Sequence, residues 1–474
     1  MSRRRYLALD LGAESGRAML ATLADHTINL EELHRFPNTP VRLPNGLYWD
    51  TLRLFHEICE GIRASVKAVA RLDGMAIDTW GVDFGLLGAD GALIENPRHY
   101  RDARTHGVSE EVFRVVPKQE VFAQTGTQFM EINSLYQLYS IAQRTPELLR
   151  NASKLLFMPD LLNYFLTGVQ CSERTIASTS QFYNPATGAF STDMLRKLGI
   201  PGSFLAELVD PGTHLGEVLP HISEQCGLRH DPVVYTTGCH DTASAVAAVP
   251  AREGSNWCYI SSGTWSLMGV ELKAPVISAA ALAANVTNEA GVGNRIRLLK
   301  NIAGLWVLQE CRRAWAREGH EYSYADLIEL ASNAKPTATV LDLDEFVAPG
   351  RHPERIREHC RKTHQEMPED AGSTVRVILY SLAVRYREVL EILETLTNRR
   401  IDVIHIVGGG SKNRLLNQLA ADVTGCTVLA GPSEATAAGN ALTQAMGAGD
   451  VKDLEEAREV VRRSFEVEEF RPRR

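Results

Sequence analysis

The feature that most constrains this chain is a strand–polar turn–strand pattern that occurs twice, once at the start of each half. The first copy is YLALDLGAESGRAML, in which an apolar run ends at Asp10 and a second run follows the turn. The second copy, WCYISSGTWSLMGV, has serines, a glycine and a threonine at the turn. A chain of 474 residues is long for one hydrophobic core. Two related domains are therefore expected, although a chance resemblance between two hairpins would produce the same pattern.

Other segments alternate between strand-like and helix-like patterns. Apolar residues spaced by three and four predict helices in INSLYQLYSIAQRTPELL, LWVLQECRRAWAREG and VRVILYSLAVRYREVLEILETL. PVVYTTGCHDTASAVAAVP reads as a strand, a glycine turn and a helix that begins near Asp241. DVIHIVGGGSKNRLLNQLAADVTG reads as a strand, a glycine turn and a helix N-capped by Ser411. Residues 250–256 have the composition of a linker, and the charge-rich residues after Asp450 are expected to be peripheral.

Composition excludes several classes of function. The net charge of -8 argues against nucleic acid as the main partner, but small anions remain possible because backbone N–H groups bind them. The eight cysteines form no C-x-x-C pair, which argues against a zinc site and against a disulfide framework. The apolar stretch before Asp10 is too short for a signal peptide, and no run approaches the length of a membrane span. We therefore expect a cytoplasmic protein without a membrane partner.

The first turn carries the residue types of a phosphate and metal site. Aspartate is disfavoured inside a strand, so Asp10 at a strand end indicates either a solvated loop or a bound cation. Gly12 and Gly16 permit positive φ and let backbone N–H groups approach a phosphate. Ser15 and Arg17 add a hydroxyl and a permanent charge. A tight hairpin with a surface aspartate is the alternative; a P-loop is excluded, because its motif is absent.

Two further turns carry a weaker form of this signal. The second hairpin has Ser262, Gly263 and Thr264, and would contact a phosphate if it lay opposite the first. Three glycines at 408–410 precede a helix whose N-terminus favours an anion, without the spacing of a dinucleotide fingerprint. A sharp strand-to-helix turn explains the same glycines.

Polar residues next to strands and helices supply candidates for the chemistry. Asp241 is either a helix N-cap or a base beside a substrate hydroxyl. His240 is either a ligand or a buried, hydrogen-bonded histidine, and Trp80 either stacks on a sugar or packs in the core. Asn301 lies at an expected helix start with Gln309 two turns later, and each is either a cap or an exposed polar residue.

The order of these blocks resembles that of the carbohydrate kinases of the FGGY family. The resemblance rests on D-x-G-x-x-S-x-R at the first turn, FMPDLLNYFLTG, CHDTASAV, SSGTWSLMG and HIVGGG, and extends over about residues 6–445. It implies an α/β fold of two actin-like, ribonuclease-H-like domains with a cleft between them. The implied boundaries are 4–248 for the domain with the sugar side and first phosphate hairpin and 255–446 for the nucleotide domain, followed by a charged tail, 447–474.

The resemblance also implies roles for individual residues. Asp241 would be the proton acceptor, and the substrate would be bound by Gly81, His240, Asp241, Thr242 and Asn301. ATP would be bound by Ala13, Glu14, Ser15, Gly16, Arg17, Thr264, Gln309 and Gly409. Asp10 would act through Mg²⁺. Glu14 departs from the family pattern, which has a small residue there, and either repels phosphate or assists the metal ion.

The implied reaction is transfer of the γ-phosphoryl group of ATP to the 1-hydroxyl of a ketose. The resemblance of the blocks IDTWGVDF and CHDTASAV to those of one branch of the family implies L-rhamnulose as the acceptor, with fuculose and xylulose as alternatives. An actin-like protein that binds ATP without phosphorylating a sugar is a further alternative, since it would keep the phosphate hairpins without needing Asp241.

Overall fold

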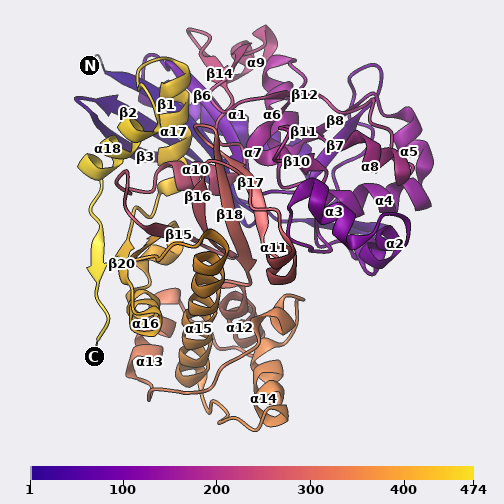
Figure 1. The fold of residues 1–474 in the computed structure, drawn as a ribbon. Helices are drawn as coiled ribbons and strands as arrows, with labels where there is room; N and C mark the ends of the chain where they lie inside the picture. The colour runs from indigo at the N-terminus through magenta and orange to yellow at the C-terminus, as the bar shows by residue number, and fades with distance from the viewer. Residues whose placement is uncertain (1–2, 474) are drawn as a thin grey trace. The chain divides into compact units, whose positions relative to one another are not determined.

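The computed structural model describes residues 3–473 and has an α/β architecture of two compact units (Figure 1). Unit 1 consists of the residues up to Arg252, Glu271–Leu298 and Ala435–Ser464. Unit 2 consists of Glu253–Val270, Leu299–Glu434 and the residues from Phe465 onward. The expected domains, 4–248 and 255–446, are each one continuous stretch of the chain. They therefore differ from these units, each of which is made of several separate segments.

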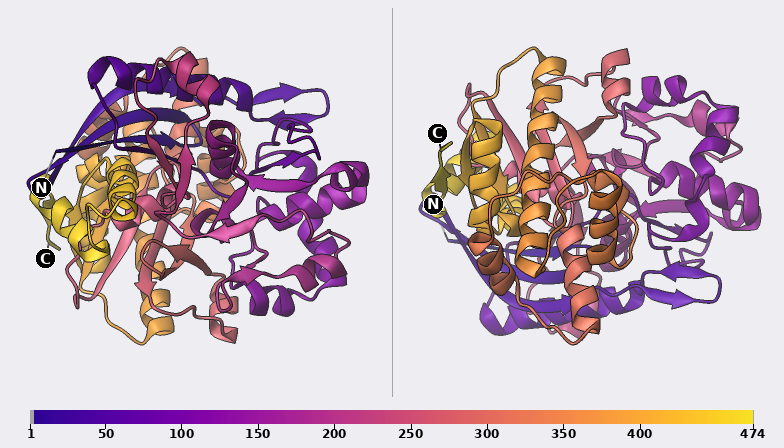
Figure 2. Two further views of the ribbon diagram at one scale, coloured as in Figure 1. Left: turned by 90° about the horizontal axis from the view of Figure 1, so that it is seen from above. Right: turned by 90° about the horizontal axis from the view of Figure 1, so that it is seen from below.

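The central sheet of unit 1 begins with an antiparallel meander. Its strands are, in sheet order, β13 (His214–Glu217), β14 (Val233–Tyr235), β6 (Gly74–Thr79), β1 (Arg4–Leu11), β2 (Ser15–Ala24) and β3 (Thr27–Pro37). β1 pairs antiparallel with β2, and β2 with β3, whereas β1 and β6 are parallel. The first three strands run side by side in indigo in Figure 2. The carboxyl ends of β1 and β6 therefore lie at one edge of the sheet.

Helices cover both faces of this sheet because β1 is apolar on both sides. Leu9 belongs to a core cluster with Ile58 of α1 (Thr51–Ala68). The neighbouring Ala8 packs with Ala437 of α17 (Ala435–Gly447). Successive side chains of a strand point to opposite faces, so the two helices lie on opposite sides of the strand.

A mostly helical region follows β6, as the periodicity of the sequence predicts. Its elements are β7 (Phe84–Leu87), η1 (Ala103–Thr105), α2 (Val108–Val115), α3 (Lys118–Thr125), α4 (Ser134–Arg144), α5 (Pro146–Asn151), β8 (Lys154–Phe157) and α6 (Met158–Thr167). β7 and β8 pair antiparallel and interrupt the helices. The other elements of unit 1 are β4 (Val41–Leu43), β5 (Gly46–Tyr48), β9 (Cys171–Glu173), α7 (Arg174–Ala177), β10 (Tyr183–Asn184), β11 (Ala189–Phe190), α8 (Thr192–Lys197), β12 (Glu207–Val209), α9 (Pro220–Cys226), α10 (Asp241–Ala247), α11 (Ala279–Ala284), β17 (Thr287–Gly291) and α18 (Leu454–Ser464).

Unit 2 is also built on a hairpin whose first strand continues into parallel pairing. β15 (Trp257–Ser262) is antiparallel to β16 (Ser266–Leu272) and parallel to β19 (Val403–Val407). The arrangement matches that of β1 with β2 and β6, so the two hairpins occupy equivalent places in the topology. The other elements are β18 (Arg295–Ile302), which crosses between the units, α12 (Trp306–Arg317), α13 (Tyr324–Asn333), η2 (Leu343–Phe346), α14 (His352–Lys362), α15 (Ala371–Thr397), η3 (Gly409–Lys412), α16 (Arg414–Thr424), β20 (Thr427–Ala430) and β21 (Glu468–Phe470).

Two local expectations are wrong. The residues after Asp450 are not peripheral, because α18 buries apolar side chains spaced by three or four residues and β21 pairs with β20. Ser411 is not the N-cap of α16, because a 3₁₀ turn, η3, intervenes and Asn413 accepts the capping hydrogen bond from the backbone N–H of Leu416. Among residues 3–473, no helix is both long and apolar enough to cross a membrane.

Candidate active site

The first turn places Asp10 and Arg17 opposite each other at the end of the β1–β2 hairpin. They are partners in the strand register, and Arg17 Nη2 lies 2.5 Å from Asp10 Oδ2. The turn is closed by the Gly12 N–H, which donates to the Ser15 carbonyl at 2.9 Å. Arg17, which was predicted to bind phosphate, is thus the ion-pair partner of Asp10, which was predicted to act through the metal ion. Glu14 is exposed beside them, and Ala13 and Ser15 are half-buried.

The two glycines of this turn lack the predicted positive φ, and Gly16 is required for packing. Neither Gly12 nor Gly16 has a positive φ. A Cβ on Gly16 would instead lie 2.1 Å from the ring of Phe36 on β3. Gly16 is therefore needed for side-chain packing, which the local sequence could not reveal because Phe36 lies 20 residues away.

Asp78 is a site residue that the sequence analysis missed. It lies on β6, directly opposite Asp10 in the strand register, and is fully buried. Asn440 Nδ2 donates to its Oδ2 at 2.6 Å, while its Oδ1 has no hydrogen-bond partner among the described residues. Burial, and then the charge of Asp10, raises the pKa of Asp78 well above its usual value. An aspartate inside a buried strand was the available signal, the same one that identified Asp10.

Asp241 lies at the same edge of the sheet. The backbone before α10 continues the sheet beside β6: Thr79 N–H donates to the Cys239 carbonyl at 2.9 Å, and Thr79 bridges to His240. Asp241 is the first helical residue and His240 occupies the N-cap position, which excludes the N-cap alternative for Asp241. Thr242 donates its hydroxyl proton to Asp241 Oδ1 at 3.0 Å. Asp10, Asp78 and Asp241 are therefore brought together from three segments.

The electrostatic environment makes Asp241 a stronger base. Burial raises the pKa of its carboxyl group, the neighbouring His240 lowers it, and Asp10 raises it again; the net direction is upward. The Asp241 side chain keeps 29% of its surface exposed, so burial acts less strongly on it than on the enclosed Asp78. A raised pKa combined with an accessible oxygen suits a general base.

The helix that begins at Asp241 is held by a close helix contact and by a buried carboxylate. A Cβ on Gly439 of α17 would lie 1.8 Å from the carbonyl oxygen of Ser244 in α10, so only glycine permits this approach. Glu173 accepts hydrogen bonds from the backbone of α7 and from Cys239 N–H at 3.2 Å. His240 N–H donates to Thr175 Oγ1 at 3.2 Å. The backbone on both sides of the base is thereby fixed.

Trp80 packs in the core and does not form a sugar platform. It is 5% exposed, its ring centroid lies 4.0 Å from that of Trp49, and its Nε1 donates to Asp83 at 3.0 Å. Gly81 follows at the end of β6 and packs against Thr179, where an added Cβ would be 3.1 Å from the methyl group. Burial raises the pKa of Asp83 to about 6.

In unit 2, the two predicted turns meet at the ends of parallel strands. Ser261 on β15 pairs with Val407 on β19, so the turns at 262–264 and 408–410 are neighbours. Gln309 Nε2 on α12 lies 3.3 Å from Thr264 Oγ1. A Cβ on Gly410 would lie 2.0 Å from Ser262 Oγ, whereas one on Gly409 would have no atom within 4 Å. Thr264 and Gln309 are thus in contact, and the turn that contains Gly409 neighbours the turn that contains Thr264.

Asn301 does not lie at a helix start. It belongs to β18, and α12 begins five residues later at Trp306. The predicted helix start is too early, because residues 295–302 (RIRLLKNI) alternate between apolar and polar side chains and form a strand instead. Trp306 N–H then donates to the Thr264 carbonyl at 3.0 Å and places Gln309 beside this turn.

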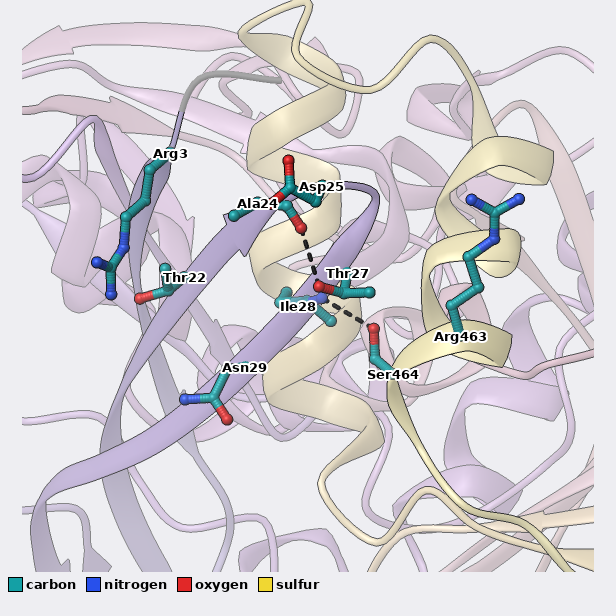
Figure 3. Close-up of a pocket in the computed structure, with 9 residues that line it drawn as sticks. All are labelled: Arg3, Thr22, Ala24, Asp25, Thr27, Ile28, Asn29, Arg463 and Ser464. Atoms are coloured by element: carbon teal, nitrogen blue, oxygen red, sulfur yellow. Dashed lines mark hydrogen bonds between the residues drawn. The ribbon is translucent and has the colours of Figure 1, made fainter.

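A shallow groove on unit 1 contains none of the predicted residues (Figure 3). Arg3, Asn29 and Arg463 contribute polar groups to it, and Ser464 Oγ accepts a hydrogen bond from Ile28 N–H at 2.8 Å. Within residues 3–473, no group of three or more His, Cys, Asp or Glu side chains could hold a metal ion by itself. A cation at Asp10 would therefore need water or phosphate oxygens as additional ligands.

The comparison with known proteins identifies the class. Residues 5–248 match the N-terminal domain of the FGGY family of carbohydrate kinases, and residues 258–448 match its C-terminal domain. The chain belongs to this family, so it is an ATP-dependent sugar kinase, and the expected two-domain α/β fold is confirmed.

The chain is also similar to individual members of this family. The chain is 43% identical over 472 residues to the rhamnulokinase of Bacteroides thetaiotaomicron, covering 99% of this chain and 96% of that protein. It is 40% identical over 473 residues to the rhamnulokinase of Enterococcus faecalis, covering 99% and 94%. The solved gluconate kinase from Lactobacillus acidophilus has a TM-score of 0.82 at 14% identity, covering 100% of this chain and 94% of that one. At that identity the likeness concerns the fold alone.

Proposed function

We propose that this chain is an L-rhamnulose kinase that transfers the γ-phosphoryl group of ATP to the 1-hydroxyl of the ketose, giving L-rhamnulose 1-phosphate and ADP. The similarity to rhamnulokinases over nearly the whole chain supports this substrate. The observation that carries the chemistry is the Asp241 carboxyl group, which is partly exposed, raised in pKa and fixed at the start of α10. Because ATP is the co-substrate, we place the reaction in the cytoplasm.

Proton removal is the task of Asp241. Phosphoryl transfer requires mainly positioning and charge neutralisation, and a positioned base adds about 10²–10⁴ in rate. Asp241 accepts the proton of the sugar hydroxyl as its oxygen bonds to the γ-phosphorus. ADP leaves with the electron pair of the broken P–O bond. Negative charge on Asp10 raises the pKa of Asp241 and so strengthens the base.

The proposed binding residues are described for each unit separately. In unit 1, His240 and Thr242 flank Asp241 in the chain and Gly81 follows the end of β6, and these residues would bind the ketose. Residues 13–17, in the first turn, would bind the phosphates of ATP. In unit 2, Thr264, Gln309 and the turn at Gly409 form the nucleotide side. Asn301, on β18, is proposed as a further substrate ligand.

Asp10 would hold Mg²⁺, which neutralises phosphate charge when it is bound. The fit is chemical: carboxylate oxygens are ligands that Mg²⁺ prefers, and the ion usually retains several waters. Asp78 carries a buried oxygen without a hydrogen-bond partner next to Asp10 in the register. Arg17 already neutralises one oxygen of Asp10, which favours contact through water.

The test is an ADP-release assay with L-rhamnulose, L-fuculose, D-xylulose and glycerol. A site built to bind particular hydroxyls leaves its own polar groups unpaired when a hydroxyl is inverted or missing, at about 1–3 kcal/mol each. L-rhamnulose should therefore exceed the others in kcat/KM by at least about tenfold. Asp241→Asn should lower kcat by about 10²–10⁴ while ATP still binds. A higher kcat/KM for D-xylulose or glycerol would refute the substrate, and sugar-independent ATP turnover would favour an actin-like protein.

A further inference from the structure

A strained turn follows the end of β6, at Gly81. Asp83 N–H donates to the Gly81 carbonyl at 3.0 Å across a single residue, Val82, whose φ is +70°. A hydrogen bond between residues two positions apart, with a positive φ between them, defines the form of γ-turn that is rare and strained. A β-branched residue is an outlier at such a φ, and Val82 is the one β-branched residue with a left-handed φ in the described part of the chain. The turn therefore persists because its surroundings hold it.

Side chains from other segments fix the backbone on both sides of Val82. Its N–H donates to Thr179 Oγ1 at 3.0 Å, and its carbonyl accepts a hydrogen bond from the hydroxyl group of Ser134, the first residue of α4. Gln137 Nε2, one helical turn later, lies 3.4 Å from the same carbonyl. Thr179 and Ser134 are buried, so water does not compete for these bonds.

Asp83 fixes the end of the turn by accepting hydrogen bonds from four donors. Its Oδ2 accepts from the indole N–H groups of Trp49 and Trp80, at 2.6 and 3.0 Å, and from Tyr100 N–H at 3.2 Å. Its Oδ1 accepts from Gln137 Nε2 at 2.9 Å. N–H groups only donate, so both sides of the residue 83 side chain must be acceptors. That side chain is 1% exposed, so water does not replace either oxygen.

A further hydrogen bond fixes the direction of the Gln137 amide group. Arg104 Nη2, which only donates, lies 2.6 Å from Gln137 Oε1. On the other side, Gln137 Nε2 also donates to the Ile132 carbonyl at 2.9 Å. The amide group therefore cannot reverse without turning its donors toward Arg104. An asparagine at position 83 that kept its oxygen on the indole groups would turn its own NH₂ group toward Gln137 Nε2, where two donors would face each other without an acceptor.

The turn is joined directly to the loop that carries the proposed base. Thr79, the last residue of β6, donates its N–H to the Cys239 carbonyl at 2.9 Å and forms a β-bridge with His240. Gly81, the first residue of the turn, is half-buried, whereas the other two turn residues are buried. The Gly81 backbone is thus the part of the turn that a ligand can reach.

We propose that Asp83 is a positioning residue for the ketose: through Gln137 and the indole groups it holds Val82 at its left-handed φ, and so keeps the Gly81 backbone in the conformation that binds the sugar. The proposal rests on the proposed function, in which Gly81 binds the ketose. Val82 by itself favours a negative φ, so the turn relaxes when the Asp83 carboxylate is removed. The ketose then binds only the fraction of molecules that keep the turn, which raises its apparent dissociation constant by the inverse of that fraction.

The test compares the kinetics of Asp83→Asn with those of the wild type. A left-handed φ disfavours a non-glycine residue by about 5- to 150-fold, so KM for L-rhamnulose should rise by about tenfold or more. Saturating ketose selects the molecules that keep the turn, so kcat should stay within about threefold, as should KM for ATP. Asp450→Asn is the matched control, because it removes a carboxylate that accepts from Arg4 and Tyr6 at the start of β1, the end of the strand away from the turn. This control should leave KM for the ketose unchanged.

A second substitution separates positioning from a general effect on the fold. Glycine adopts a positive φ without strain, so Val82→Gly should keep the turn in the absence of the carboxylate and lower KM for L-rhamnulose at least about threefold in the Asp83→Asn background. The same substitution removes a buried side chain and should lower Tm further. A role confined to stability therefore predicts a further loss of activity where positioning predicts a rescue.

Ser134→Ala is a milder variant, to be used if Asp83→Asn does not fold. It removes one hydroxyl donor to the Val82 carbonyl, so it should raise KM for L-rhamnulose about threefold and be rescued by Val82→Gly in the same way. An unchanged KM for the ketose, a fall in kcat alone, or the absence of rescue would overturn the proposal and leave the kinase function intact. Failure of the wild-type protein to phosphorylate L-rhamnulose would refute the proposed function instead.

Discussion

Two adjacent glycines in unit 2 allow packing and ligand contact to be tested separately. A Cβ on Gly410 would lie 2.0 Å from Ser262 Oγ, 2.5 Å from Ser262 Cβ and 3.0 Å from the Ser262 carbonyl oxygen. A Cβ on Gly409 would have no atom within 4 Å. Neither residue has a φ in the left-handed region. Alanine at the two positions therefore differs in one respect, the contact with Ser262.

Gly410→Ala should destabilise the protein by overpacking. Non-bonded heavy atoms are most stable at about 3.5–4.0 Å, and rotating the serine hydroxyl away leaves its Cβ and carbonyl oxygen too close. The turn must move away from the end of β15 by roughly 1 Å, at a cost of about 1–3 kcal/mol. A loss of about 2 kcal/mol corresponds to a Tm lowered by about 4–8 °C in a unit of this size. Ser262→Gly combined with Gly410→Ala should restore part of that Tm.

Gly409→Ala should leave stability intact and weaken nucleotide binding. A compatible Gly→Ala substitution stabilises by about 0.4–1 kcal/mol, so Tm should stay or rise slightly. If the nucleotide lies on this turn, the new methyl group should raise KM for ATP by about tenfold, equivalent to about 1.4 kcal/mol. Thermal denaturation and initial rates at varied ATP measure both effects. An unchanged Tm for Gly410→Ala would refute the packing argument, and an unchanged KM for Gly409→Ala would refute the contact with ATP.

Three further predictions concern unit 1. Asp10→Ala should lower kcat and raise the Mg²⁺ concentration needed for half-maximal rate; an unchanged Mg²⁺ dependence would place Asp10 outside the metal's environment. Gly439→Ala would put a Cβ 1.8 Å from the Ser244 carbonyl oxygen, so it should cost about 1–3 kcal/mol and lower kcat because α10 begins at Asp241; retained activity and Tm would show that the helices separate freely. Burial raises the pKa of the Glu173 carboxyl group from 4.5 to about 7. The protonated carboxyl group therefore contributes fully to the free energy of unfolding below about pH 4.5, and this contribution, up to about 3 kcal/mol, is lost as pH rises through 7. In urea unfolding between pH 5 and 8, the free energy of unfolding of Glu173→Gln should not show this decrease with pH. A difference in that free energy between the variant and the wild type that stays constant with pH would contradict the prediction.

Much of the fold could be predicted because its signals are local. The apolar runs around the two polar turns predicted both hairpins, and the residues after Gly238 predicted α10. Strand and helix periodicity depends on side chains two to four positions apart, which one segment contains in full. Asp10 and Asp78 also carried a local signal, a carboxyl group in a buried strand, although only the first was recognised.

Only the tertiary structure determined which residues from distant parts of the chain come into contact. Gly16 is required by a phenylalanine on another strand, and Trp80 is buried because Trp49 and Asp83 surround it. Glu289 and Arg297 carry no motif of their own; their contact with His240 exists because β17 and β18 pack behind the start of α10. Hydrogen bonds and ion pairs act over about 3–4 Å between atoms, and residues 50 positions apart reach that range only through the packing of the whole unit.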